Sequence, residues 1–310
     1  MTLSQKVRGW IKAINSSNEV SVQAMEQLLG RLGESSREGG VSTMEIIDPH
    51  IHVDLVSLQD LRSMATTGVT ACVSHTYYPH VNVAITSQTI LDFYERLLKF
   101  ETWRAAQELI DTYAAISLNP VSIPQDYEKV LEEIPKYLKE EKVVAVGEIG
   151  LEPGSKTCPD LGTQEEIVNA QLRIAKQYDK PVVFHTPQAD KLKWVRKYFD
   201  FITRENVDPA KVVIDHADGT VARAISDFGC VAGITVQPWR NLTPADGAKI
   251  ASDCPYDKVL IDSDCSPLLS DPLSVPKTAH EMRRLGISGG DIRRMLFENP
   301  RRIFNLGRGQ

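Results

Sequence analysis

The sequence predicts an α/β protein whose main part is a (β/α)8 TIM barrel. From residue 44 onward, eight apolar, β-branched runs alternate with helix-like segments, and metal-binding side chain types end five of these runs. Alternating strands and helices imply a parallel sheet, and eight repeats match the usual barrel size of about 250 residues. A doubly wound sheet is the rival fold. It would not naturally bring together side chains from strands one, four, five, six and eight.

The first 40 residues have a different pattern from the rest. Apolar residues recur at helical spacing in two stretches, which predicts two short amphipathic helices before a polar, glycine-rich stretch over 33–43. We therefore divide the chain into a helical N-terminal extension with linker (1–43) and a barrel (44–310). The helices are expected to pack on the barrel or to form a homo-oligomer interface.

The predicted strands follow in order along the remaining chain. They cover 44–52, 69–75, 113–118, 143–148, 181–185, 212–216, 230–236 and 258–264. One intervening helix is predicted over 163–178, with Thr163 and Glu166 as a capping box, and another begins at Thr243-Pro244. Two helical segments after residue 276 would complete the ring.

Composition narrows the class of protein. A 42% apolar and 25% charged chain is typical of a soluble globular protein, and a net charge of −6 argues against a dedicated polyanion binder, although it leaves room for a local basic groove. No apolar run approaches the roughly 20 residues of a membrane span, and the start lacks a secretory signal. Five cysteines without CxxC spacing indicate reduced thiols, so we expect a cytoplasmic protein.

Candidate metal ligands stand where the predicted strands end. His50 and His52 close the first strand, and period-2 alternation turns both imidazoles to one face, with Asp48 on the same parity. Glu148 ends the fourth strand, where a buried carboxylate is costly without a cation. His185 and His216 end the fifth and sixth strands. Taken singly, each could be a hydrogen-bonded structural residue; together they predict a metal centre at the barrel mouth.

The last strand ends in two carboxylates of the same parity. Asp262 and Asp264 would repel each other unless a cation or protonation relieved them. Asp264 lies nearer the loops, so we assign it to metal binding and proton transfer, with Asp262 behind it. The reversed assignment remains open.

These motifs, taken in order, resemble the TatD-type metal-dependent hydrolases of the amidohydrolase superfamily. The resemblance covers about residues 44–305. It is carried by DPHIH, GEIGLE, VFHTP, the strand end at His216, LIDSDCSP, and the late Asn299-Pro300 with Ile303-Phe304. The N-terminal extension, Cys265 between Asp264 and Ser266, and the segment after His216 depart from the family pattern.

The resemblance implies a site with one or two divalent ions. In it, His50, His52 and Asp264 hold one ion, His185 and His216 hold a second, and Glu148 bridges them. Divalent ions activate water at neutral pH, and Asp264 would take its proton. Several histidines favour zinc, whereas the carboxylates leave manganese or magnesium open.

Two further residues are candidates for substrate binding. His75 ends the second strand, and Arg240, with Gln237 and Trp239, follows the seventh. His75 could equally cap a loop, and Arg240 could equally form an exposed salt bridge. His80 and His280 are expected to be structural or solvent-exposed, and Cys265 to be a packed thiol rather than a nucleophile.

The predicted function is hydrolysis of a phosphodiester, ester, lactone or amide by metal-activated water, with deoxyribonuclease activity as one form suggested by the resemblance. Whether the substrate is a small molecule or a nucleic acid stays open. Two alternatives remain: a non-catalytic metal-containing barrel that binds a partner protein, and a lyase or isomerase on the same scaffold.

Overall fold

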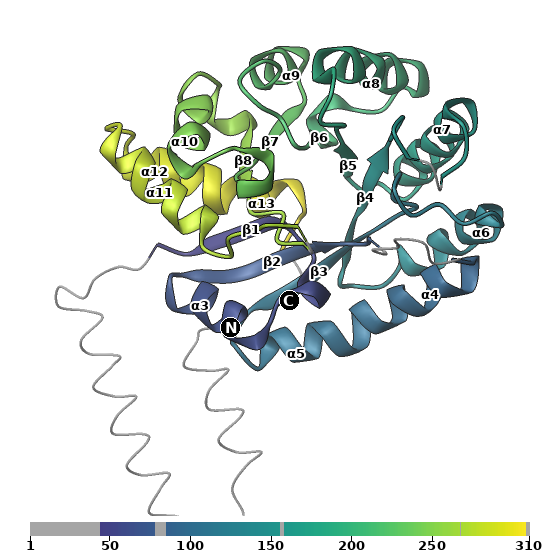
Figure 1. Cartoon of the computed structure of the whole chain (residues 1–310), viewed down its shortest axis with the longest axis horizontal. Helices are drawn as coiled ribbons and strands as arrows, with labels where there is room; N and C mark the ends of the chain where they lie inside the picture. Colours follow the sequence, from purple (N-terminus) through teal and green to yellow (C-terminus); the bar gives the residue numbers. More distant parts are fainter. Residues whose placement is uncertain (1–43, 78–84, 156–157, 267, 308–310) are drawn as a thin grey trace, which may run out of the picture. The chain divides into compact units, whose positions relative to one another are not determined.

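A parallel eight-stranded sheet forms the centre of the structure, a computed structural model that describes residues 44–77, 85–155, 158–266 and 268–307 (Figure 1). The strands lie in the order of the sequence, each hydrogen-bonded to the next. The predicted TIM-barrel class is therefore confirmed. The two helices predicted before residue 43, the oligomer interface assigned to them and His80 lie outside the described residues, and the division near residue 43 stays a prediction.

The strands are short and almost completely buried, as expected where helices cover a parallel sheet. Their bounds are β1 Ile46–Ile51, β2 Val69–His75, β3 Asp111–Ile116, β4 Val143–Gly150, β5 Val182–His185, β6 Val212–Ile214, β7 Val231–Thr235 and β8 Val259–Asp262. All eight predicted strands are present, with ends shifted by a few residues.

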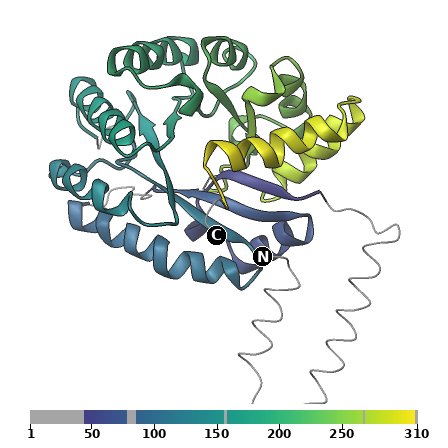
Figure 2. The same ribbon diagram turned by 180° about the vertical axis from the view of Figure 1, so that it is seen from behind.

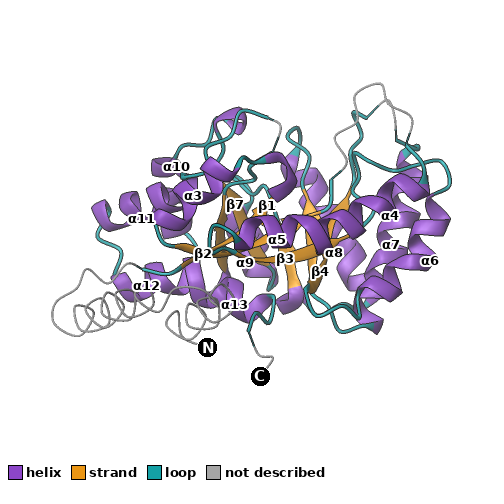
Figure 3. Cartoon of the chain, turned by 90° about the horizontal axis from the view of Figure 1, so that it is seen from below, coloured by secondary structure: helices purple, strands orange, loops and turns teal. Residues whose placement is uncertain are grey.

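Helices surround the strands, as Figure 3 shows with helices in purple and strands in orange. Their bounds are α3 Leu58–Thr66, α4 Ser87–Arg96, α5 Thr102–Ala106, α6 Tyr127–Tyr137, α7 Leu161–Gln177, α8 Lys191–Glu205, α9 Ala222–Phe228, α10 Pro244–Ser252, α11 Ser274–Arg284, α12 Gly289–Arg293 and α13 Asn299–Ile303. Single π-helical turns at Leu97–Glu101 and Arg294–Glu298 join α4 to α5 and α12 to α13.

Helix starts test the predictions from sequence. Thr243 caps α10 with Asp246 in a capping box, as the Thr-Pro pair predicts. The prediction for α7 was wrong in detail, because this helix starts earlier, at Leu161. Its cap is Asp160, whose carboxylate accepts a hydrogen bond from the Thr163 amide. Asp is as good a cap as Thr, so the competing cap residue three positions upstream of the predicted helix prevailed.

The first and last strands meet at their carboxyl ends. Ile51 and Cys265 form a parallel bridge, the His52 amide donates to the Cys265 carbonyl at 2.9 Å, and the Asp264 amide donates to the His50 carbonyl at 3.0 Å. These bonds close the barrel. They also set the DPHIH and DSDCSP segments side by side, although more than 200 residues separate them.

The C-terminal part of the chain packs against this seam. The π-turn Arg294–Glu298 contacts both β1 and β8, and α13 contacts both as well; Figure 2 shows these helices in yellow from behind. Phe297, Ile303 and Phe304 join one apolar cluster with strand residues.

In the part of the chain that the structure describes, no helix is long and apolar enough to cross a membrane.

Candidate metal centre

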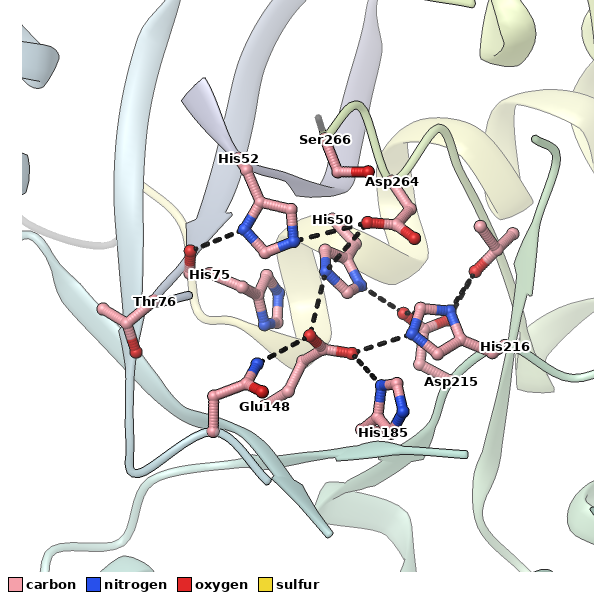
Figure 4. Close-up of polar contacts among 12 residues, drawn as sticks. His50, His52, His75, Thr76, Glu148, His185, Asp215, His216, Asp264 and Ser266 are labelled. Atoms are coloured by element: carbon pink, nitrogen blue, oxygen red, sulfur yellow. Dashed lines mark hydrogen bonds and ion pairs between the residues drawn. The ribbon is translucent and has the colours of Figure 1, made fainter. Parts of the chain in front are cut away.

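A cavity of about 170 Å³ opens at the carboxyl ends of the strands. The strand-end residues His52, Glu148, His185, His216 and Asp264 line its wall. His50 lies beside them and is almost completely buried. All six predicted metal ligands are therefore brought to one place (Figure 4).

His50, His52 and Asp264 form a first group of ligand atoms. One ligand atom from each lies within 4.8 Å of the others. Asp264 Oδ1 is 3.3 Å from His52 Nε2 and 3.8 Å from His50 Nε2. These three side chains come from the seam between β1 and β8.

Glu148, His185 and His216 form a second group. Glu148 Oε1 is 2.9 Å from His216 Nε2 and 3.2 Å from His185 Nδ1. The other oxygen, Oε2, is 3.6 Å from His50 Nε2 in the first group. Asn119 donates to this Oε2 at 3.0 Å and so fixes the plane of the carboxylate. The two oxygens of Glu148 thus face different groups.

The far side of each histidine ring is occupied by a protein acceptor. His52 Nδ1 donates to the His75 carbonyl at 3.0 Å, and His216 Nδ1 donates to the Thr235 hydroxyl at 2.8 Å. His185 Nε2 contacts Glu152 Oε2 at 3.3 Å. Such partners fix the tautomer of a metal-binding histidine and leave the lone pair of its other nitrogen free.

His50 shows the clearest fit to a cation. Its Nδ1 is hydrogen-bonded to Asp215 Oδ2. Its Nε2 is buried and has no hydrogen-bond partner, although it faces Glu148 and Asp264. A buried nitrogen without a partner is costly, and a metal ion would satisfy it.

Charge in the site supports the same interpretation. Burial raises the pKa of Glu148, but the charge of His50 and the contacts with His185 and His216 outweigh it and hold that pKa well below its usual range. Burial and the nearby Arg240 lower the pKa of His216 to about 4. At neutral pH the glutamate is therefore ionised and this imidazole is neutral, which are the forms that bind metals. Nearby carboxylates act in the opposite direction on two other histidines, because they outweigh burial and raise the pKa of His50 well above its usual range and that of His185 to about 8.

The two aspartates at the end of β8 differ in their surroundings. Burial and the charge of Asp215 raise the pKa of Asp262 well above its usual range. Burial also raises the pKa of Asp264, but the hydrogen bond with His52 and the charge of His50 hold it below its usual range. Asp264 lines the cavity and Asp262 does not.

Backbone geometry positions two of these side chains. His216 and Asp264 both have positive φ, at 57° and 41°, a conformation that costs energy for residues other than glycine. The Lys191 ammonium donates to the His216 carbonyl at 2.7 Å, and the Gln237 amide donates to the Asp264 carbonyl at 2.5 Å. Buried hydrogen bonds thus hold both carbonyls in place.

The expectation that His75 touches substrate is corrected by its position. His75 is completely buried, does not line the cavity, and places its Nε2 3.1 Å from the Pro49 carbonyl. Its ring lies against that of His50, with centroids 4.0 Å apart. The inward parity of strand β2 carries it behind His50 instead of over the mouth. Arg240, by contrast, does line the cavity, and its Nη2 is 3.2 Å from Asp264 Oδ2.

Asp215, Glu152 and Asn119 are functional candidates that the sequence did not single out. Asp215 directly precedes His216, and this adjacency was a signal that could have pointed to it. Asp48, which shares the parity of His50 and His52 on the first strand, accepts from the Ser263 hydroxyl at 2.6 Å and the His50 amide at 3.3 Å. The Asp48 carboxylate is therefore hydrogen-bonded to backbone amides and to a serine hydroxyl, not to a histidine ring.

Comparison with known proteins places the chain in a family. The family model for TatD related DNase matches residues 47–305. An uncharacterized metal-dependent hydrolase of Methanocaldococcus jannaschii is 27% identical over 262 residues, spanning 84% of this chain and 100% of the relative. An uncharacterized metal-dependent hydrolase of Mycobacterium tuberculosis, named TatD, is 26% identical over 288 residues, spanning 84% and 98%.

Solved structures agree. The TatD-like protein of Archaeoglobus fulgidus superposes with a TM-score of 0.68 at 25% identity, covering 84% of this chain and 100% of the other. A β-aspartyl dipeptidase of Fervidobacterium islandicum AW-1, at 18% identity, has a TM-score of 0.61 over 85% of this chain and 75% of the other, and shows the shared fold alone. With its barrel and its strand-end ligand cluster, this chain belongs to the TatD family of metal-dependent hydrolases.

Proposed function

We propose that the chain is a two-ion hydrolase with Glu148 as the shared ligand. His50, His52 and Asp264 would hold one ion, and His185 and His216 would hold the other. The observation that carries this proposal is that the two carboxylate oxygens of Glu148 face different side chains. Oε2 faces His50, and Oε1 faces His185 and His216. A single-ion site would need only one of these oxygens.

The donor set also indicates which metal is held. Four imidazoles with two carboxylates suit zinc better than the hard, oxygen-preferring magnesium. A carboxylate oxygen of Asp215 also lies within 4.8 Å of ligand atoms of His50, Glu148 and His216. We assign Asp215 to the orientation of His50 rather than to an ion, because its Oδ2 is hydrogen-bonded to His50 Nδ1. All five cysteines are free, which fits a reducing, cytoplasmic setting.

The ions would supply Lewis acidity and activate water at neutral pH. Asp264 is placed to accept the proton of that water, since it is ionised and lines the cavity. It then returns the proton to the leaving oxygen or nitrogen as the scissile bond breaks. Arg240 beside Asp264 Oδ2 favours the ionised form of the aspartate before the reaction begins.

Metal stoichiometry tests the two-ion site. We expect about two equivalents of zinc in the wild-type protein, and about one in each of His50→Ala and His185→Ala, with the circular dichroism spectrum retained. His280→Ala is the matched control, because His280 is exposed on α11. Unchanged metal content in both site variants would overturn the ligand assignment.

Isotope labelling tests the reaction class. Turnover of a small ester, lactone or phosphoester panel in ¹⁸O-labelled water should place one labelled oxygen in the product. Product without label would indicate a lyase or isomerase, and no turnover of any hydrolysable bond would favour a non-catalytic barrel. Single-stranded DNA belongs in the same panel, because the family model is described as a DNase.

A further inference from the structure

The mouth of the cavity carries one cationic group in a distinctive setting. Arg240 is the single Lys or Arg among the described residues that line the cavity. Its side chain is 9% exposed, and its Nε is buried without a hydrogen-bond partner. Its Nη1 and Nη2 contact Gln188 and Asp264, at 3.3 Å and 3.2 Å. The guanidinium therefore keeps donor capacity free at the cavity wall.

Apolar side chains lie on the same part of the wall. Trp239 and Leu268 line the cavity and are 48% and 39% exposed. Val121 and Tyr77 line it as well. The Trp239 ring and Leu268 thus offer apolar surface beside the Arg240 guanidinium, whose carbon lies 5.6 Å from the centroid of the tryptophan ring.

The size of the cavity limits the substrate. A cavity of about 150 Å³ accommodates benzene, so the space of about 170 Å³ holds a group of about that size. A single-strand binding groove instead combines many cations with stacked aromatics over several nucleotides. The described wall of this cavity has one cationic side chain, Arg240, and therefore lacks the row of cations that such a groove needs.

We infer that the substrate is a small ester or phosphoester that carries an anionic two-oxygen group and an apolar substituent of about the size of a phenyl ring. The anion lies against Arg240, and the substituent lies against Trp239 and Leu268. This inference rests on the proposed function for the position of the scissile bond. A guanidinium fork suits carboxylate and phosphoryl oxygens alike, so both chemistries are tested.

Titration calorimetry with the zinc-loaded protein tests the inference. The probes are phenylphosphonate, phenylacetate, methylphosphonate and a single-stranded thymidylate dodecamer. We expect Arg240→Gln to weaken binding of at least one phenyl anion by about 10-fold or more, because charge-assisted hydrogen bonds are lost. Arg240→Lys should be intermediate, and Arg283→Gln, an exposed arginine on α11, should bind like the wild type.

A separate comparison tests the proposed contact of the apolar substituent with Trp239. Wild-type protein should bind phenylphosphonate more tightly than methylphosphonate, and Trp239→Ala should reduce that preference. Equal binding of both phenyl anions by wild type and Arg240→Gln, with unchanged unfolding temperature, would overturn the inference. Tighter binding of the dodecamer than of either phenyl anion, falling steeply with salt, would overturn it in favour of a nucleic-acid substrate.

Metal analysis of the same samples separates the two proposals. A wild-type protein that holds no zinc contradicts the two-ion site, and the Arg240 comparison still decides the anion pocket. Full zinc content, with binding of the phenyl anions that does not depend on Arg240, would support the two-ion site and contradict the proposed anion pocket.

Discussion

Two layers of the barrel interior, built by the same strands, have opposite character. Val183, Val213 and Leu260 belong to one apolar cluster. His185, Asp215 and Asp262 follow each of them by two residues, on the same face of β5, β6 and β8 or just beyond the strand end. Two residues further along each strand, the side chains that face the barrel interior therefore change from packed apolar ones to polar ones.

This difference shows that the stability of the barrel and its chemistry depend on different layers of side chains. The apolar layer gains free energy from burial, and its residues have no polar atoms to satisfy. The polar layer holds several ionised groups out of water, which is costly unless each is paired. Substitutions in the two layers should therefore affect different measurements.

The largest effect is expected in the polar layer. Asp264→Asn removes the proposed proton acceptor and should lower kcat by about 10²- to 10⁴-fold. Asp253→Asn, on an exposed aspartate, is the control. Rates measured at saturating zinc check this. A kcat within about 2-fold of the wild type would remove Asp264 from proton transfer.

A cavity in the apolar layer should act on stability alone. Leu260 is 1% exposed, so Leu260→Ala should lower the free energy of unfolding by about 2–5 kcal/mol. Zinc content and kcat below the unfolding temperature should be unchanged. Leu285→Ala, at a 56% exposed position, should cost far less. A loss of zinc in Leu260→Ala would show that the layers are coupled.

Asp215 tests the boundary between the layers. Its carboxylate orients His50, and the absent side chain of Gly233 makes room for it, since a Cβ there would overlap Asp215 Oδ1. Asp215→Asn should weaken zinc binding by about 10- to 100-fold, as losses of such hydrogen-bond acceptors do. Gly233→Ala should act in the same direction by displacing the carboxylate. Competition with a zinc chelator measures both, and unchanged affinity in both contradicts the role.

The smallest effect is expected at Thr235. Its hydroxyl accepts from His216 Nδ1 and lies 3.4 Å from Asp215 Oδ1. Thr235→Val keeps the shape but loses one hydrogen bond, worth about 0.5–1.5 kcal/mol, or about 2- to 10-fold in zinc affinity. Thr235→Ser restores the hydroxyl and should restore the affinity. A valine variant with less zinc than Asp215→Asn would reverse the proposed order.

Local patterns were enough to find the strands and the side chains that gather at their carboxyl ends. His50, Glu148, His185 and Asp264 each follow or end a short apolar run, and parallel strands of a barrel deliver such residues to one rim. The exact start of α7 was missed because Asp160 and Thr163 are both good caps and only packing chooses between them.

The sequence by itself therefore determined the barrel class, the order of its strands and the six side chains at its mouth, because period-2 burial and strand-end position are local properties of the chain. The tertiary structure decided that His75 lies behind His50, that Asp215 supports His50 across 165 residues of sequence, and that Glu148 divides its oxygens between two groups. These are contacts between distant strands. They depend on register and ring orientation, which packing of the whole barrel fixes.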